Sequence, residues 1–199
     1  MMKRQRGIAA VEFALLLPFL LFLLFGVIDG ARALQANIIV VNLSREGANL
    51  VSRGNIQLET NSQDIIYALM ASAPPLNVNQ RGMMIITRVM GVKTSSGTRS
   101  VVLDQYRWDD PARGLGYGTS KYAPASRVYQ CGGWTGPRCS AINATARPGV
   151  NIMSGQLDDG EVIHVVETFY KYDMLLTGFS IGALALPTLG PDLYSMTIF

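Results

Sequence analysis

Residues 7–29 read GIAAVEFALLLPFLLFLLFGVID, an apolar stretch that ends at Asp29 and has one carboxylate inside it, Glu12, near its start. A helix from Ile8 to Asp29 would be roughly 31 Å long at about 1.5 Å per residue, which is close to the hydrocarbon thickness of a bilayer. Basic residues precede this stretch, and the positive-inside bias keeps such residues in the cytoplasm. The sequence therefore predicts a membrane-spanning helix over residues 8–29, with the rest of the chain on the outer side.

Glu12 is the unexpected residue of this stretch. A carboxylate in a membrane helix costs roughly 2.5 to 3.5 kcal/mol at the helix centre on insertion scales. We therefore expect Glu12 to have a function. Gly7 stands five residues before it, where the basic leader meets the apolar helix.

Gly7 and Glu12, followed by an apolar helix, resemble the processing site of type IV prepilins. In that family a membrane aspartyl protease cuts after the glycine, so the resemblance places the cut between Gly7 and Ile8 and makes residues 1–7 a cytoplasmic leader. It also implies that Glu12 neutralises the new amine of Ile8 in an adjacent subunit, and that Glu12 and Phe13 serve recognition and subunit docking.

A narrower resemblance rests on residues 9–18, AAVEFALLLP, with LLFG at residues 23–26 and GARAL at residues 30–34. These residues are similar to the TadE-like pseudopilins of the tight-adherence (Flp, type IVb) pilus. Asp29 is a departure, since relatives more often have Glu there. The related TadF and TadG subunits share this N-terminus, so the subtype stays open.

The resemblance implies a minor pilin that takes part in assembling a Flp-type pilus for adhesion and secretion. Its expected partners are the inner membrane, a prepilin peptidase, other pilin-like subunits and the proteins of the Tad assembly platform. We expect a single-pass protein of the bacterial inner membrane, with a cytoplasmic N-terminus and a periplasmic C-terminal domain.

Helical spacing of apolar residues continues beyond the membrane through residues 30–53, and Gly54 is a good stop. An amphipathic extension of this kind needs a partner for its apolar stripe. We therefore predict an α+β protein. Its long N-terminal helix carries a domain of residues 54–199 with a short helix and an antiparallel sheet.

The pattern of residues 54–199 predicts one helix and four strands. The helix begins at Ser62 or Gln63 with Asn61 and Ser62 as caps, and ends at Ala73 before Pro74-Pro75. The expected strands are Met83–Val92, Ser100–Trp108, Val162–Tyr172 and Leu193–Phe199. The first two form a hairpin through residues 94–97.

Residues 109–155 form a stretch rich in Gly, Pro and Ser, which is typical of a long loop. Cys131 and Cys139 lie in this loop on the oxidising side of the membrane, so we expect a disulfide between them, worth roughly 2.5 kcal/mol. The aromatic residues of this region suit either a contact surface or the cover of a thin core: Trp108, Tyr117, Tyr122, Tyr129 and Trp134. The apolar tract Leu175–Leu189 is too short and broken to span a bilayer, which favours a role in the core.

Charge and composition exclude several functions. The net charge is +3, but the leader holds three of the 17 basic residues, so 14 basic and 14 acidic residues remain after processing. No basic face for nucleic acid is then expected. His164 is the only histidine and lies in a predicted strand, which favours a structural role over a catalytic one.

We expect no enzyme, cofactor, metal or small-molecule substrate. The two acidic groups, one of Asp104, Asp109 and Asp110 and the other of Asp158, Asp159 and Glu161, lack the ligand spacing of a calcium loop, so we interpret them as solvated turns.

Other classes of protein stay open. Ala31-Arg32-Ala33 has the form of a signal-peptidase site, and cleavage there would release a secreted binding protein that begins at Leu34. Glu12 inside the apolar region, and the length of that region, argue against this. An uncleaved anchor on an envelope binding protein or enzyme is the other alternative.

Overall fold

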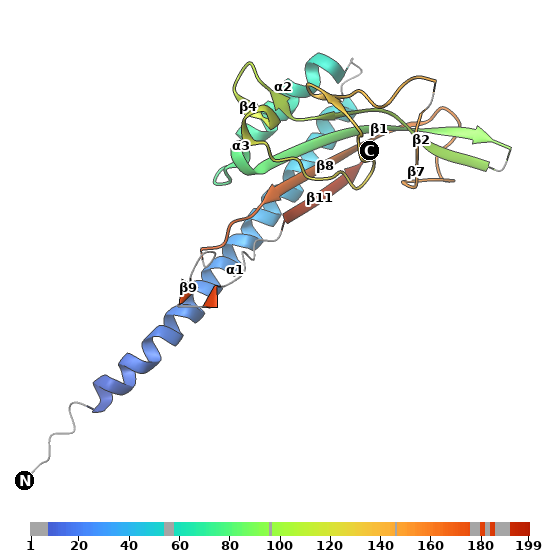
Figure 1. Cartoon of the computed structure of the whole chain (residues 1–199). Helices are drawn as coiled ribbons and strands as arrows, with labels where there is room; N and C mark the ends of the chain where they lie inside the picture. The colour runs from blue at the N-terminus through green and yellow to red at the C-terminus, as the bar shows by residue number, and fades with distance from the viewer. Residues whose placement is uncertain are drawn as a thin grey trace, which may run out of the picture. The chain divides into compact units, whose positions relative to one another are not determined.

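The structure is a computed structural model that describes residues 8–53, 58–95, 97–145, 147–175, 180–181, 184–185 and 192–199 (Figure 1). The chain divides into two compact units. We call residues 1–36 with 172–191 the helix unit, and residues 37–171 with 192–199 the sheet unit. The sheet unit therefore begins inside the long helix, at Asn37, and it leaves out residues 172–191.

The helix α1 runs from Ile8 to Arg53 without interruption, which confirms the predicted long helix. Its first part lies in the helix unit, and the part from Asn37 onward belongs to the sheet unit. Gly7 and Gly54, the expected processing residue and the expected helix stop, lie outside the described residues.

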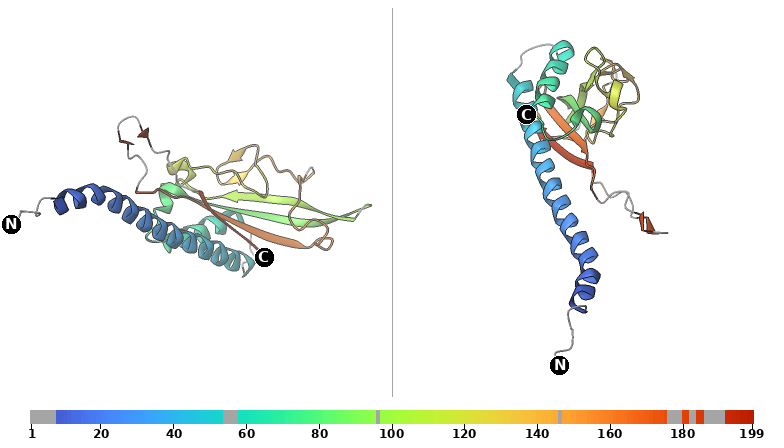
Figure 2. Two further views of the ribbon diagram at one scale, coloured as in Figure 1. Left: turned by 90° about the horizontal axis from the view of Figure 1, so that it is seen from below. Right: turned by 90° about the vertical axis from the view of Figure 1, so that its left-hand side faces the viewer.

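The part of α1 in the sheet unit buries one stripe of residues: Val40, Leu43, Ser44, Gly47, Ala48 and Val51. The spacing of three and four residues places them on one helix face. This face packs on the sheet (Figure 2), and Gly47 allows the close approach, because a Cβ there would lie 3.2 Å from Val166 Cγ1 and 3.3 Å from Leu69 Cδ1. Ser44 Oγ also donates a hydrogen bond to the carbonyl of Val166 at 3.1 Å.

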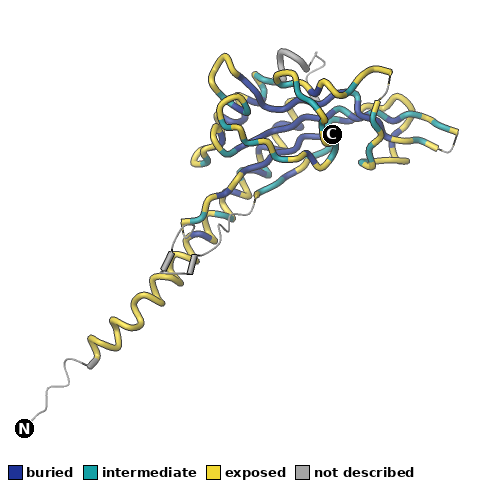
Figure 3. Tube along the Cα trace, viewed as in Figure 1, coloured by how far each residue is buried: buried dark blue, intermediate teal, exposed yellow. Residues whose placement is uncertain are grey.

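The main sheet is antiparallel, with the strand order β11-β8-β1-β2-β6-β5 and with β7 paired to β2. Its long strands are β1 (Gly82–Thr94), β2 (Gly97–Arg107), β8 (Val162–Lys171) and β11 (Asp192–Ile198). All four strands and the β1–β2 hairpin were predicted from the sequence, with ends that differ by at most three residues. Buried residues concentrate along these strands (Figure 3).

The predicted start of the second helix is wrong. The helix α2 is Leu58–Ala71, so Asn61 and Ser62 lie inside it and cannot cap it. Both residues lower helix propensity by well under 1 kcal/mol, so they do not force a helix to begin. The helix ends two residues earlier than predicted, where the Ser72 N–H and Oγ both donate to the carbonyl of Leu69. The four-residue helices α3 (Val78–Arg81) and α4 (Tyr117–Ser120) are too short to show a period in the sequence.

The segment 109–155 is irregular, as predicted, but it returns repeatedly to the sheet. Its two-residue strands include β6 (Arg138–Cys139) and β7 (Gly149–Val150), and both pair with β2. Val128, Val150 and Ile152 pack against a buried cluster formed by Val89, Leu157, Ile163 and Val165. The segment therefore covers part of the sheet and is not a free loop. The remaining short strands are β3 (Asp109–Asp110), β4 (Leu115–Gly116), β5 (Trp134–Thr135), β9 (Ser180–Ile181) and β10 (Leu184–Ala185).

Gly91 in β1 is the tightest position of this packing. Its N–H donates to the carbonyl of Glu161, and its carbonyl accepts from the Gly160 N–H, both at 2.9 Å. A Cβ at residue 91 would overlap the carbonyl oxygen of Asp158 and lie 2.8 Å from Leu157 Cβ. Only glycine fits here without a backbone shift.

We predict that Gly91→Ala lowers the free energy of unfolding of the sheet unit by about 1 to 3 kcal/mol, the usual cost of forcing atoms into a packed site. The measurement is chemical denaturation of the full chain in detergent, with unfolding monitored by tryptophan fluorescence. Gly132→Ala is the control, because a Cβ there would meet only Ala141 Cβ at 3.8 Å. Equal stability of the two variants would contradict this account of residue 91.

Candidate functional site

The N-terminal half of α1 exposes an almost continuous apolar surface. Large apolar side chains are between 38% and 74% exposed at Val11, Phe13, Leu15, Leu16, Leu17, Phe19, Leu20, Leu21, Phe22, Leu23, Leu24, Phe25, Val27 and Ile28. Soluble proteins rarely expose an apolar patch of this extent. Within the described residues α1 is the one helix that is long and apolar enough to cross a membrane, with a mean hydropathy of 2.6. These properties support membrane anchoring.

The predicted site residues lie at the start of this surface. Ile8 is the first residue of α1, and Glu12 and Phe13 lie in the next turn with exposed side chains. Adjacent residues of a helix point about 100° apart around its axis, so the side chains of Glu12 and Phe13 face different directions. Among the described residues, none forms a hydrogen bond or an ion pair with Glu12. The carboxylate is thus free to meet a group from another molecule.

Asp29 ends the apolar surface, and its environment could not be predicted from the sequence. Its side chain is almost fully buried, whereas the residues on either side of it along α1 are exposed. The Leu175 N–H donates to Asp29 Oδ1 at 2.9 Å, and the Tyr172 hydroxyl donates to the Asp29 carbonyl at 3.3 Å. Arg32 lies 3.8 Å from the same carboxylate. Asp29 therefore ties the chain that follows β8 to the helix. Most of the tract Leu175–Leu189, which we expected in the core, lies outside the described residues, and Leu175 itself is exposed.

The first acidic group corrects a sequence prediction. Asp104, Asp109 and Asp110 are buried and not solvated. Asp104 binds the Arg88 guanidinium through both carboxylate oxygens, and these hydrogen bonds raise the pKa of Arg88. Asp109 and Asp110 face Arg107 and Arg113 at 3.5 and 2.6 Å. The Arg88–Asp104 contact joins β1 and β2, which sequence spacing does not reveal, whereas Arg107 and Arg113 are two and three residues from their partners. Asp158, Asp159 and Glu161 are exposed in the turn before β8, as expected.

Glu167 in β8 is a residue that the sequence analysis missed. Its carboxylate is fully buried and accepts hydrogen bonds from Ser126 Oγ, from the Arg127 N–H at 2.8 Å and from the Tyr194 hydroxyl at 3.0 Å. Burial and this carboxylate raise the pKa of Tyr194, so the phenol stays a donor at neutral pH. Through its hydrogen bonds with Ser126 and Arg127, Glu167 therefore connects the irregular segment with β8 of the sheet. The sequence signal for this buried carboxylate was an acidic residue inside a predicted strand that is rich in β-branched residues.

The aromatic residues of the irregular segment serve as cover for the sheet. Trp108 is fully buried, and the Arg107 guanidinium lies between Tyr117 and Trp134, at 3.6 and 4.8 Å from the ring centroids. Cys131 and Cys139 form a disulfide, the pairing expected from the sequence. These contacts stabilise the segment, and they leave little aromatic surface for a partner.

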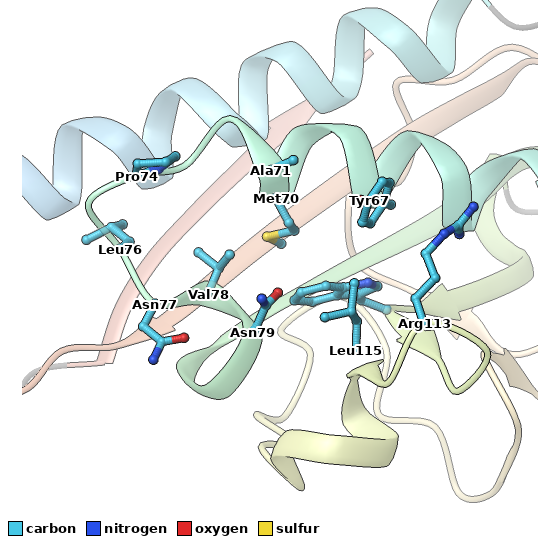
Figure 4. Close-up of a pocket in the computed structure, with 11 residues that line it drawn as sticks. Tyr67, Met70, Ala71, Pro74, Leu76, Asn77, Val78, Asn79, Arg113 and Leu115 are labelled. Atoms are coloured by element: carbon cyan, nitrogen blue, oxygen red, sulfur yellow. The ribbon is translucent and has the colours of Figure 1, made fainter.

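A surface cavity lies between α2, α3 and β4 and has a volume of about 510 Å³ (Figure 4). Its lining combines apolar side chains such as Met70, Val78 and Leu115 with Asn79. Arg113 at its border is neutralised by Asp64 and Asp110. Among the described residues no three His, Cys, Asp or Glu side chains are placed to hold a metal ion. Among the described residues that line the cavity, the one charged side chain, Arg113, is paired, and none is a Cys, Ser, Thr or His.

The geometry thus defines a membrane-anchored class of protein, in which an exposed apolar helix continues into an α+β domain. The family described as TadE-like protein matches residues 7–49, and this match confirms the resemblance of the N-terminal segment. No curated protein and no solved structure matches the chain.

His164 supplies a pH prediction for the sheet unit. It lies opposite Arg88 across β1 and β8, and burial together with this guanidinium lowers the pKa of His164 below 6.5. As the pH falls below about 6.5, the His164 imidazole is protonated in the unfolded chain but stays neutral in the folded chain. Protonation therefore favours the unfolded chain, and the free energy of unfolding decreases. We predict that His164→Gln reduces the drop in melting temperature between pH 7.5 and pH 5.5. An unchanged drop would assign the pH dependence to the carboxylates.

Proposed function

We propose that this chain is a minor pilin, or pseudopilin, that takes part in assembling a Flp-type (Tad) pilus used in adhesion and secretion. A prepilin peptidase cuts after Gly7 and removes residues 1–7. The new N-terminus at Ile8, with Glu12 and Phe13, then docks onto other pilin-like subunits and the assembly platform.

One observation carries this proposal. The TadE-like match begins at Gly7 and extends along α1, and within it an unpaired carboxylate, Glu12, stands on an exposed apolar helix. A carboxylate is costly in lipid unless a cation pairs with it. The amine of Ile8 in a neighbouring subunit is such a cation, and it would lie at a similar depth in the membrane, because Ile8 is about one helical turn from Glu12.

The proposed topology places the leader in the cytoplasm, α1 in the inner membrane and the sheet unit in the periplasm. The positive charges of the leader favour this orientation. The Cys131–Cys139 disulfide supports it, because disulfides persist on the oxidising side of the membrane.

The signal-peptide alternative conflicts with the contacts of Asp29. Cleavage after Ala33 would remove Asp29, which accepts hydrogen bonds from Tyr172 and Leu175. Those donors would lose their partner in the mature protein. We therefore favour a helix that stays attached.

The first test is the mature N-terminus. We predict that the protein from wild-type cells begins at Ile8, and that Gly7→Leu prevents cleavage because the isobutyl group does not fit a protease site built for glycine. Mass spectrometry of the purified protein measures both. Gly26→Leu is the control, since a Cβ at Gly26 meets nothing within 4 Å. A mature protein that begins at Leu34 would overturn the proposal.

The second test separates membrane insertion from assembly. Glu12→Ala makes the helix more apolar, so insertion should be retained. Docking should suffer, because an unpaired buried partner typically costs about 3 to 5 kcal/mol, a loss of more than about 100-fold in affinity. We expect a stable membrane protein that no longer co-purifies with other pilus proteins and leaves the cells without pili.

The matched control for this test is Glu46→Ala, which removes an exposed carboxylate farther along α1. Membrane fractionation, pull-down and electron microscopy of pili provide the readouts. Normal piliation in the Glu12→Ala strain would show that the carboxylate has no docking role.

A further inference from the structure

The chain that follows β8 returns to α1 at the end of its apolar surface. The Leu175 N–H donates to Asp29 Oδ1 at 2.9 Å, and the Tyr172 hydroxyl donates to the Asp29 carbonyl at 3.3 Å. All three residues belong to the helix unit. The two hydrogen bonds therefore fix the place of Leu175 along the helix.

Asp29 stands at one boundary of the membrane-spanning part of α1. The helix from Ile8 to Asp29 is roughly 31 Å long at about 1.5 Å per residue, which is close to the hydrocarbon thickness of a bilayer. The almost continuous run of exposed apolar side chains along it ends at Ile28. An amide that bonds to the Asp29 carboxylate lies at the same depth. If α1 spans a membrane, Leu175 therefore lies where the hydrocarbon ends.

Leu175 lies in a tract without charged residues. Residues 174–191 read MLLTGFSIGALALPTLGP, and the charged residues that flank them are Asp173 and Asp192. Apolar stretches that are too short or too broken to span a bilayer are typical of protein cores and of segments that lie in the membrane interface. The composition of the tract thus permits either environment.

The described part of the tract does not join the core of the sheet unit. Leu175 is 54% exposed. The strands β9 and β10 pair with each other and form a small sheet apart from the main one. The tract also belongs to the same unit as the first part of α1, and not to the sheet unit. These observations favour the membrane interface, where exposed apolar side chains have a partner.

Lipid is the occupant that the position of Leu175 favours. The acyl chains that surround the exposed side chains of α1 end close to Ile28, and the amide of Leu175 is held at the next residue. We propose that Leu175 makes a second contact with the membrane, in which its side chain enters the bilayer interface beside α1. The proposal requires that α1 spans a membrane, and it does not depend on a role in pilus assembly.

The test uses the full chain with Leu175→Trp, reconstituted as single copies in phosphatidylcholine nanodiscs without other membrane proteins. The Leu175 side chain takes no part in the hydrogen bond to Asp29, so the substitution should leave the fold intact. The lipids carry bromine, which quenches tryptophan on contact, either near the headgroup end or near the methyl end of their acyl chains. The emission of the added tryptophan is the difference from the wild-type protein, which contains Trp108 and Trp134.

Two matched variants on α1 calibrate the measurement. Leu20→Trp places the probe near the middle of the span, and Leu50→Trp places it roughly 31 Å beyond Asp29 at about 1.5 Å per residue. Both leucines are exposed, at 52% and 42%. We expect bromine near the headgroups to quench Leu175→Trp more than bromine near the methyl ends does. The reverse should hold for Leu20→Trp, and neither lipid should quench Leu50→Trp.

Two results would overturn the proposal. The first is a Leu175→Trp signal that no brominated lipid quenches but aqueous iodide does, because residue 175 would then lie in water. The second is a signal that neither bromine nor iodide quenches, because the protein itself would then cover this residue. A lack of lipid quenching in Leu20→Trp would overturn more than this contact, since α1 would then not span the bilayer.

Discussion

The contact between α1 and the sheet is the interaction on which the sheet unit depends. Gly47 removes the side chain that would hold the two apart, and Ser44 replaces an apolar contact with a hydrogen bond to the Val166 carbonyl. The neighbouring Val40, Leu43 and Val51 then lose almost all their exposure to water. Burying such a side chain stabilises a fold by about 1.5 to 3 kcal/mol, so this one stripe secures the helix to the strands.

The same helix meets two different environments along its length. From Val11 to Ile28 its side chains point outward in all directions and are apolar, which suits lipid or other apolar helices. From Asn37 onward it has a buried stripe and a polar face that carries Asn42, Arg45, Glu46 and Asn49. Asp29 lies between these parts and accepts hydrogen bonds from Tyr172 and Leu175. These polar contacts lie where the apolar surface of the helix ends.

Polar contacts act together with apolar burial to order the irregular segment 109–155 of the sheet unit. Glu167 receives three donors from segments distant in sequence, and Gln105 donates to Thr87, Ser126 and the carbonyl of Tyr129. Buried groups of this kind destabilise a fold when a partner is missing. They therefore favour one arrangement of residues 109–155 over the many that a glycine-rich segment could adopt. The disulfide restricts the same segment further.

The sequence by itself determined the elements whose signal is local. Apolar periodicity, turn residues and spacing predicted the helix Ile8–Arg53, the β1–β2 hairpin, β8, β11 and the Cys131–Cys139 pairing. The TadE-like segment that contains Gly7 and Glu12 was recognised by its resemblance to a known family. Only the tertiary structure decided the burial of Asp29, Glu167 and the three aspartates Asp104, Asp109 and Asp110, and the pairing of Asp104 with Arg88. These features depend on contacts between residues far apart in the chain, such as those of Asp29 with Tyr172 and Leu175 and the pairing of Arg88 with Asp104 across two strands.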